Sequence, residues 1–281
     1  MSARWAFRSA VLGGLVAAGC GAHADRIARA PDRLIEPPAR FLAPAAPPSL
    51  PESRPAPPDR PPPAPVRRAG AYANLDPEDD YVLGPPEPYA DCESELVQAG
   101  VKTRAASIPV HVAPRAKFQC GAPQVVTYLR GPGHIAYNAP PVVTCTMALA
   151  LASFERILQK EATSIFGSPV ARIDQLGTYS CRVISAYPTW VSEHSYANAI
   201  DIGSFTLANG KTVEVLRDFD VGEAPPAKPA ATFLRVVSRR ANDEDVFSHV
   251  LTPFFDAHHR NHFHLDLSRY RADGTRPQPS E

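Results

Sequence analysis

Two things are missing from this sequence: net charge and any long apolar run. Its 281 residues include 29 Lys+Arg and 29 Asp+Glu, so the formal net charge is zero. Without an overall field, nothing draws the chain to nucleic acid or to an anionic membrane surface. No stretch reaches the roughly 18 to 20 apolar residues that a membrane-spanning helix needs. We therefore expect neither a nucleic-acid partner nor a transmembrane helix, and the sequence says nothing of oligomeric state.

Proline is concentrated in one segment, and that segment cannot hold a packed core. Positions 31–90 contain 18 of the 32 prolines, and the following 191 residues contain the other 14. Such composition favours extended polyproline II structure and disorder. The sequence predicts a Pro-rich disordered tether over residues 21–90, with a Pro-rich ligand for a partner as the alternative. It also predicts one globular domain over 91–270 and a disordered tail over 271–281.

The first 20 residues resemble a secretory signal. Two arginines precede a short apolar stretch, and Ala17-Ala-Gly-Cys20 resembles a bacterial lipobox, in which the cysteine is lipidated. An ordinary cleaved signal peptide with an incidental cysteine is the alternative. We expect a signal peptide over residues 1–20, lipidation of Cys20, and membrane contact only through that anchor. Gly21 favours an outer-membrane lipoprotein facing the periplasm; otherwise the protein is periplasmic or secreted.

Four further cysteines remain, and no CxxC spacing joins any of them. In an exported protein an even set is typical of two disulfides, and three pairings are possible. Of these we favour Cys92–Cys120 with Cys145–Cys181. A structural zinc site is the competing interpretation.

Apolar spacing and turn residues predict an α+β domain. The expected helices are Cys92–Gly100, Thr144–Phe166 and Ala230–Arg240, and the expected strands are Thr178–Ala186, Ala199–Leu207, Thr212–Leu216 and His262–Leu267. Asn209-Gly210 suits the tight turn of a hairpin between two of these strands. With helices first and paired strands later, we expect a single compact domain. Its small antiparallel sheet would carry the functional site, with helices packed around it.

Two polar clusters interrupt the predicted strands. His262 and His264 would share one face of the last strand, as would Asp266, which could orient a ligand histidine. Asp201 sits between two isoleucines of the hairpin, seven residues after His194. Hydrogen-bonded strand histidines and a loop salt bridge are the alternatives, but the two clusters together indicate a metal site. Catalytic zinc takes three such ligands and keeps a position open for water.

Both clusters match a known motif. Ser192-x-His194-x-x-Ala197-x-Ala199-x-Asp201 resembles the SxHxxGxAxD motif of zinc peptidases that cut peptidoglycan peptides, namely D-Ala-D-Ala carboxypeptidases and murein endopeptidases. His262-x-His264 resembles the HxH motif of the same enzymes. More closely, the chain from Cys92 to Leu267 resembles the bacterial extensin-like C-terminal domain family. The segments that carry this resemblance are Cys120-Gly121, Thr144-Cys-Thr-Met-Ala148, Gly177-Thr-Tyr-Ser-Cys-Arg182, Ser192-Glu-His194 and His262-Phe-His-Leu-Asp266.

The resemblance implies a role for each residue. His194, Asp201 and His264 would bind Zn²⁺, His262 would be the general base, and His259 an auxiliary catalytic histidine. Apart from the resemblance, Arg182 follows Cys181 on a predicted strand and could bind a substrate carboxylate, with a structural ion pair as the alternative.

The chain departs from these peptidases at two positions. Ala197 stands where the motif has glycine, which alters the loop if that position has positive φ. Asn261 replaces the glutamate base of the carboxypeptidases, which favours the endopeptidase arrangement.

The function implied is a zinc-dependent peptidase that hydrolyses peptidoglycan stem peptides or cross-links by attack of zinc-bound hydroxide. A non-catalytic, zinc-containing module that binds the cell wall is the rival hypothesis. A weaker one is an interaction protein that works through its Pro-rich arm.

Overall fold

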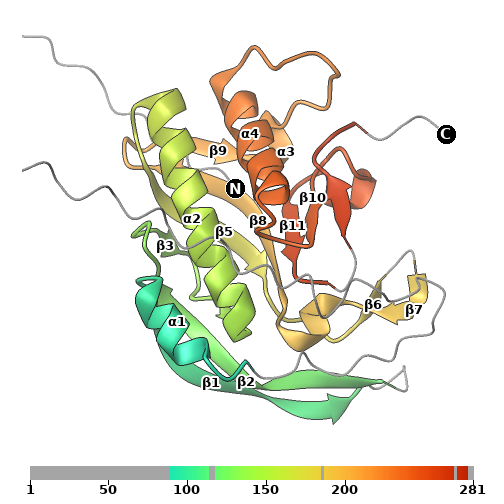
Figure 1. Cartoon of the computed structure of the whole chain (residues 1–281). Helices are drawn as coiled ribbons and strands as arrows, with labels where there is room; N and C mark the ends of the chain where they lie inside the picture. The colour runs from blue at the N-terminus through green and yellow to red at the C-terminus, as the bar shows by residue number, and fades with distance from the viewer. Residues whose placement is uncertain (1–88, 114–117, 185–186, 269–270, 278–281) are drawn as a thin grey trace, which may run out of the picture. The chain divides into compact units, whose positions relative to one another are not determined.

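The computed structural model describes residues 89–113, 118–184, 187–268 and 271–277 (Figure 1). The expected signal peptide, the lipidation site Cys20 and all but the last two residues of the expected tether lie outside these residues. Of the helices in the described part, none combines the length and the apolar character that crossing a membrane requires.

The fold is built on a seven-stranded mixed sheet. Six strands follow the order β12-β10-β11-β8-β5-β3, and β9 pairs with β8. In that order they span Ala272–Gly274, His249–Leu251, Phe263–Asp266, Ala199–Leu207, Val170–Gly177 and Ala136–Tyr137, and β9 spans Thr212–Glu214. The pairs β10–β12 and β3–β5 are parallel, and the other pairs are antiparallel.

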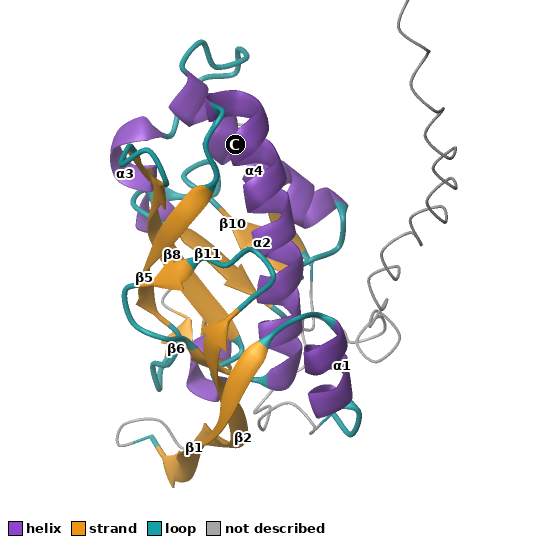
Figure 2. Ribbon diagram, turned by 90° about the vertical axis from the view of Figure 1, so that its left-hand side faces the viewer, coloured by secondary structure: helices purple, strands orange, loops and turns teal. Residues whose placement is uncertain are grey.

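Two long helices, α2 (Cys145–Phe166) and α4 (Pro229–Asp243), cover one face of this sheet (Figure 2). The Thr144 hydroxyl accepts a hydrogen bond from the Met147 amide at the start of α2. Gly167 ends the helix in the left-handed conformation that glycine adopts without strain. These signals explain why the predicted helix Thr144–Phe166 agrees with α2 to within one residue.

The apolar core lies between these helices and the sheet. It includes Leu151 and Phe154 of α2, Leu234 of α4, and Ile200 and Ile202 of β8. Successive residues of a strand face opposite sides. The residue between the two isoleucines therefore lies on the face that the helices leave uncovered.

A smaller antiparallel sheet precedes α2 in the chain. It consists of β1 (Lys102–Val112), β2 (Gln119–Arg130) and β4 (Val142–Val143). Figure 1 shows β1 and β2 next to α1 (Cys92–Gln98), which packs against α2. The remaining elements are β6 (Val183–Ile184), β7 (Tyr187–Val191), η1 (Glu193–Tyr196), α3 (Val215–Asp218) and η2 (Ala257–His259).

Both disulfides form, but the predicted pairing is wrong. The structure joins Cys92 to Cys145 and Cys120 to Cys181. Packing of α1 on α2 brings the first two together, because each lies at the start of its helix. Two disulfides indicate an extracellular or periplasmic domain.

The α+β class is confirmed, with three corrections. Helices and strands are interleaved, and the main sheet is larger than expected and mixed. Over its described residues, 178–184, the predicted strand Thr178–Ala186 is wrong, because β5 ends at Gly177 and only Val183–Ile184 of these residues pairs, as β6. Ser180 instead donates its amide to the His194 carbonyl. The expected tail contributes strand β12, so ordered structure continues past position 270.

Candidate metal centre

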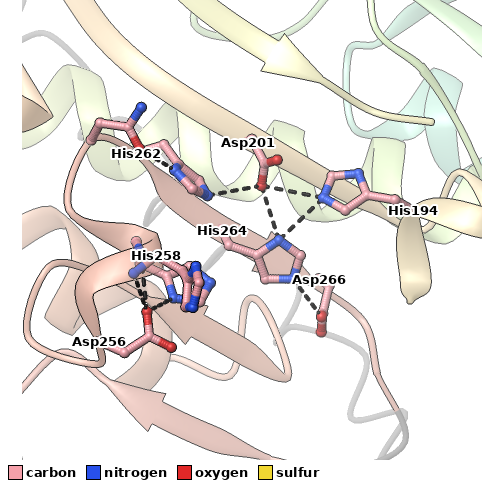
Figure 3. Close-up of polar contacts among 9 residues, drawn as sticks. His194, Asp201, Asp256, His258, His262, His264 and Asp266 are labelled. Carbon is pink, nitrogen blue, oxygen red and sulfur yellow. Dashed lines mark hydrogen bonds and ion pairs between the residues drawn. The ribbon is translucent and has the colours of Figure 1, made fainter. Parts of the chain in front are cut away.

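Three side chains from three elements meet on the uncovered face of the sheet (Figure 3). His194 comes from η1, Asp201 from β8 and His264 from β11. His264 Nδ1 lies 2.9 Å from Asp201 Oδ1, and His194 Nε2 lies 3.2 Å from each of these two atoms. The three expected ligands are therefore brought together.

Strand register explains this meeting. Asp201 and His264 are direct partners in the β8–β11 ladder, and directly opposed residues project from the same face. Phe263 and Leu265, on either side of His264, are fully buried in the core. Hydrophobic alternation in both strands thus fixes the polar face.

The donor set and its spacing fit zinc. Zinc binds imidazole nitrogen and carboxylate oxygen at about 2.0–2.2 Å, so a tetrahedral site has edges of roughly 3.3 Å. The separations of 2.9 and 3.2 Å come close to this value. A second group, His111 with Cys120 and Cys181, is less suitable, because its two sulfur atoms are bonded to each other.

Electrostatics favour an ionised aspartate in the cluster. Burial alone would raise the pKa of Asp201, but hydrogen bonds and positive charge from His194 and His264 lower it well below its usual range. Asp201 is therefore a carboxylate, the form that binds a metal.

A buried carboxylate fixes the orientation of His264. Asp266 is 3% exposed, and its Oδ2 lies 2.8 Å from His264 Nε2 and 3.2 Å from His249 Nδ1. The Ser268 amide donates to its other oxygen. Because Asp266 holds Nε2, the ring presents Nδ1 to the cluster.

These two carboxylates also govern the protonation of His264. Burial alone would lower the pKa of this ring, but hydrogen bonds to Asp201 and Asp266 raise it to about 10. Burial alone would raise the pKa of Asp266, but the positive charge of His249 and hydrogen bonds from His249 and His264 lower it.

Two further histidines adjoin the ligands. His262 Nε2 lies 3.6 Å from Asp201 Oδ1, while its Nδ1 lies 2.9 Å from Asn261 Oδ1. The His259 ring is 5.3 Å from that of His262, between centroids, and its Nδ1 lies 2.6 Å from Asp256 Oδ1. Burial lowers the pKa of both His259 and His262, against the opposing effect of Asp256 and Asp201 respectively.

A family model supplies the identification. The model for the extensin-like protein C-terminus matches residues 90–276, about two thirds of the chain. The protein belongs to this extensin-like family. Comparison with curated proteins and with solved structures finds no match.

The site of this extensin-like domain includes two residues that sequence reasoning missed. Asp256 is three residues before His259 and caps η2 by accepting from the His258 and His259 amides. That spacing before two histidines is a weak sequence signal. His249 gives none, because its contact with Asp266 depends on the pairing of β10 with β11.

Ala197 adopts the left-handed conformation expected of the glycine that it replaces. Its φ is 53° and ψ 32°, which costs a non-glycine residue roughly 1–2 kcal/mol. Its methyl group packs with Ala122 and Val125. Alanine therefore occupies a left-handed position in the segment between His194 and Asp201.

Arg182 is tied to the site through its main chain. Its amide donates to Ser195 Oγ, and its carbonyl accepts from the Ser192 amide. Both partners flank His194, while the arginine side chain is exposed. This places Arg182 next to the metal-ligand segment and leaves its guanidinium available to a ligand.

Proposed function

We propose that this extensin-like domain is a zinc-dependent peptidase that hydrolyses peptidoglycan stem peptides or cross-links. The observation that carries the proposal is the convergence of His194, Asp201 and His264 beside two further histidines. A purely structural zinc site needs four protein ligands and no acid–base groups. Three ligands with adjacent histidines suit catalysis instead.

Zinc held by these ligands would supply Lewis acidity, polarising a peptide carbonyl and lowering the pKa of a coordinated water to about 7. The chain's own residues then handle protons. Hydrolysis places OH on the carbonyl carbon and H on the departing amine, so one proton must be moved between them.

His262 is suited to this proton transfer. Its Nδ1–H donates to Asn261 Oδ1, which leaves the lone pair on Nε2, the atom nearer Asp201. That nitrogen can accept the proton of water and return it to the amine. The glutamate base of the carboxypeptidases is replaced here by Asn261, which thus acquires a positioning role.

His259 and Asp266 support the reacting groups. Asp256 fixes the His259 ring, which lies 5.9 Å from His264 between centroids, and Asp266 keeps His264 Nδ1 directed at the cluster. We propose that Arg182, exposed beside the His194 segment, binds a carboxylate of the substrate.

The test is digestion of purified muropeptides by the full chain with zinc, with products identified by mass spectrometry. Wild-type protein should release smaller peptides, and His264→Ala should lose both zinc and cleavage. His258→Ala is the matched control, since His258 lies in the same segment with an exposed side chain and should behave as wild type.

Two outcomes would reject the proposal. Cleavage that survives the loss of zinc in His264→Ala would exclude the zinc mechanism. Retention of the protein on intact cell wall, with no product from any muropeptide, would select the rival hypothesis of a non-catalytic binding module.

A further inference from the structure

Two of the three candidate ligands, Asp201 and His264, belong to a row of paired residues that runs across the main sheet. On β5 the residue in this row is a glycine. Across four neighbouring strands the paired positions are Leu251 of β10, His264 of β11, Asp201 of β8 and Gly177 of β5. Directly paired residues project from the same face. Gly177 therefore lies beside Asp201 on the face that carries the site.

Neither backbone conformation nor packing requires glycine at this position. Gly177 is not among the residues with positive φ. A Cβ built on it meets no atom of the described residues within 4 Å. Glycine inside a strand often marks a place where another backbone or a ligand approaches closely. The absence of a side chain here leaves open space directly next to Asp201.

An apolar side chain borders this open space. Leu176 is 59% exposed although it is a large hydrophobic residue. Leu176 lies at an irregularity of the β5–β8 ladder. Its side chain packs over Gly203, since a Cβ built on Gly203 would be 3.3 Å from Leu176 Cδ2. Two glycines and one leucine thus form a shallow apolar strip beside the ligands.

We infer that this strip, defined by Leu176, Gly177 and Gly203, binds the substrate peptide next to the bond that is cut. The inference rests on the proposed peptidase function and names the substrate class for that site. The peptide main chain lies over Gly177, and a small apolar side chain, of the size of alanine, contacts Leu176.

Filling the open space should block the substrate and spare the metal. In the full chain loaded with zinc, Gly177→Val should lower kcat/KM for a cross-linked muropeptide dimer at least tenfold. Gly177→Ala should lower it less. The zinc dissociation constant should stay within twofold of wild type, because neither substitution replaces a candidate ligand.

Leu176→Ser should raise KM about threefold at nearly unchanged kcat, since it removes apolar contact alone. Ala171→Val is the matched control, because Ala171 is an exposed residue of the same strand outside this strip and should leave every constant unchanged.

The possible failures can be told apart. A wild-type protein that neither binds nor cleaves the dimer removes the proposed function, and this inference with it. If wild type cleaves and Gly177→Val matches it, the inference alone is wrong. A parallel loss of zinc affinity and kcat/KM in Gly177→Val would also overturn it, because Gly177 would then act on the metal ligands.

Discussion

Two regions of this domain each bury a carboxyl group, and they shift its pKa in opposite directions. Asp201 lies among histidines, which lower its pKa. Glu155, fully buried in α2, accepts hydrogen bonds from Tyr128, Tyr137 and the Gly133 amide. Burial raises the pKa of Glu155, and these neutral donors only partly oppose that effect. Histidine partners lower the pKa of a buried carboxyl group, whereas neutral donors offset only part of the rise that burial causes.

The surroundings differ in the same way. Beside Glu155, a Cβ added to Gly131 would overlap both the Tyr128 hydroxyl and the Glu155 carboxylate. Beside Asp201, a Cβ on Gly177 would have no atom within 4 Å in the part of the chain that the structure describes. The Glu155 region is closed and serves packing, while the Asp201 region is open and suited to ligands.

The largest expected effect is a loss of zinc affinity when the Asp201 carboxylate is replaced and the Glu155 carboxyl group serves as the comparison. Asp201→Asn removes the anionic ligand and leaves two imidazoles, so zinc affinity should fall at least 100-fold, as measured by competition with a chelator. Glu155→Gln is the matched control, since it makes the same chemical change in the closed region and should leave zinc affinity unaltered. Equal losses in both variants would contradict the assignment of Asp201 as a ligand.

An intermediate effect is expected at Asp266. Asp266→Asn keeps the side-chain shape but weakens its hold on His264 Nε2, and loss of such a supporting contact typically costs 10–100-fold in metal affinity. Competition titrations should give this value. Nitrogen-15 NMR of the imidazole should show that His264 is no longer held in a single tautomer. Unchanged affinity and unchanged NMR signals would mean that Asp266 only supports packing.

The smallest effect concerns pH and Glu155. Because its pKa is raised above the usual 4.5 on folding, the folded chain holds this proton more tightly than the unfolded chain. The stabilising contribution is therefore complete below pH 4.5 and is lost as pH rises through the folded-state pKa.

Urea unfolding of wild type and Glu155→Gln at a series of pH values measures this difference. Wild type should lose stability relative to the variant as pH rises, by at most about 1.4 kcal/mol per pH unit. Other titrating groups occur in both proteins and cancel. A difference that does not vary with pH would show that Glu155 has the same proton affinity in both states.

The sequence predicts the parts of the molecule that depend on local signals. The extent of α2 follows from its apolar spacing, Thr144 and Gly167. The three candidate ligands follow from motifs, and alternation correctly places His264 and Asp201 on a polar face. Function, the zinc ion itself and the roles of His259, His262 and Arg182 stay predictions.

The remainder depends on contacts between distant segments. Pairing of Cys92 with Cys145 requires α1 to pack on α2, and the contact of His249 with Asp266 requires the β10–β11 register. The segment after Gly177 has the composition of a strand, but its main chain bonds to η1 instead, as Ser180 does to His194. Tertiary hydrogen bonds override local propensity there.

The direct pairing of His264 with Asp201 has a consequence for how a metal would be acquired. Backbone hydrogen bonds of a central sheet position two of the three ligands, so folding alone assembles them. For these two side chains, ion binding would incur little conformational entropy cost. A metal would then bind to a domain that is already folded, unlike small zinc domains that remain unfolded until the ion arrives.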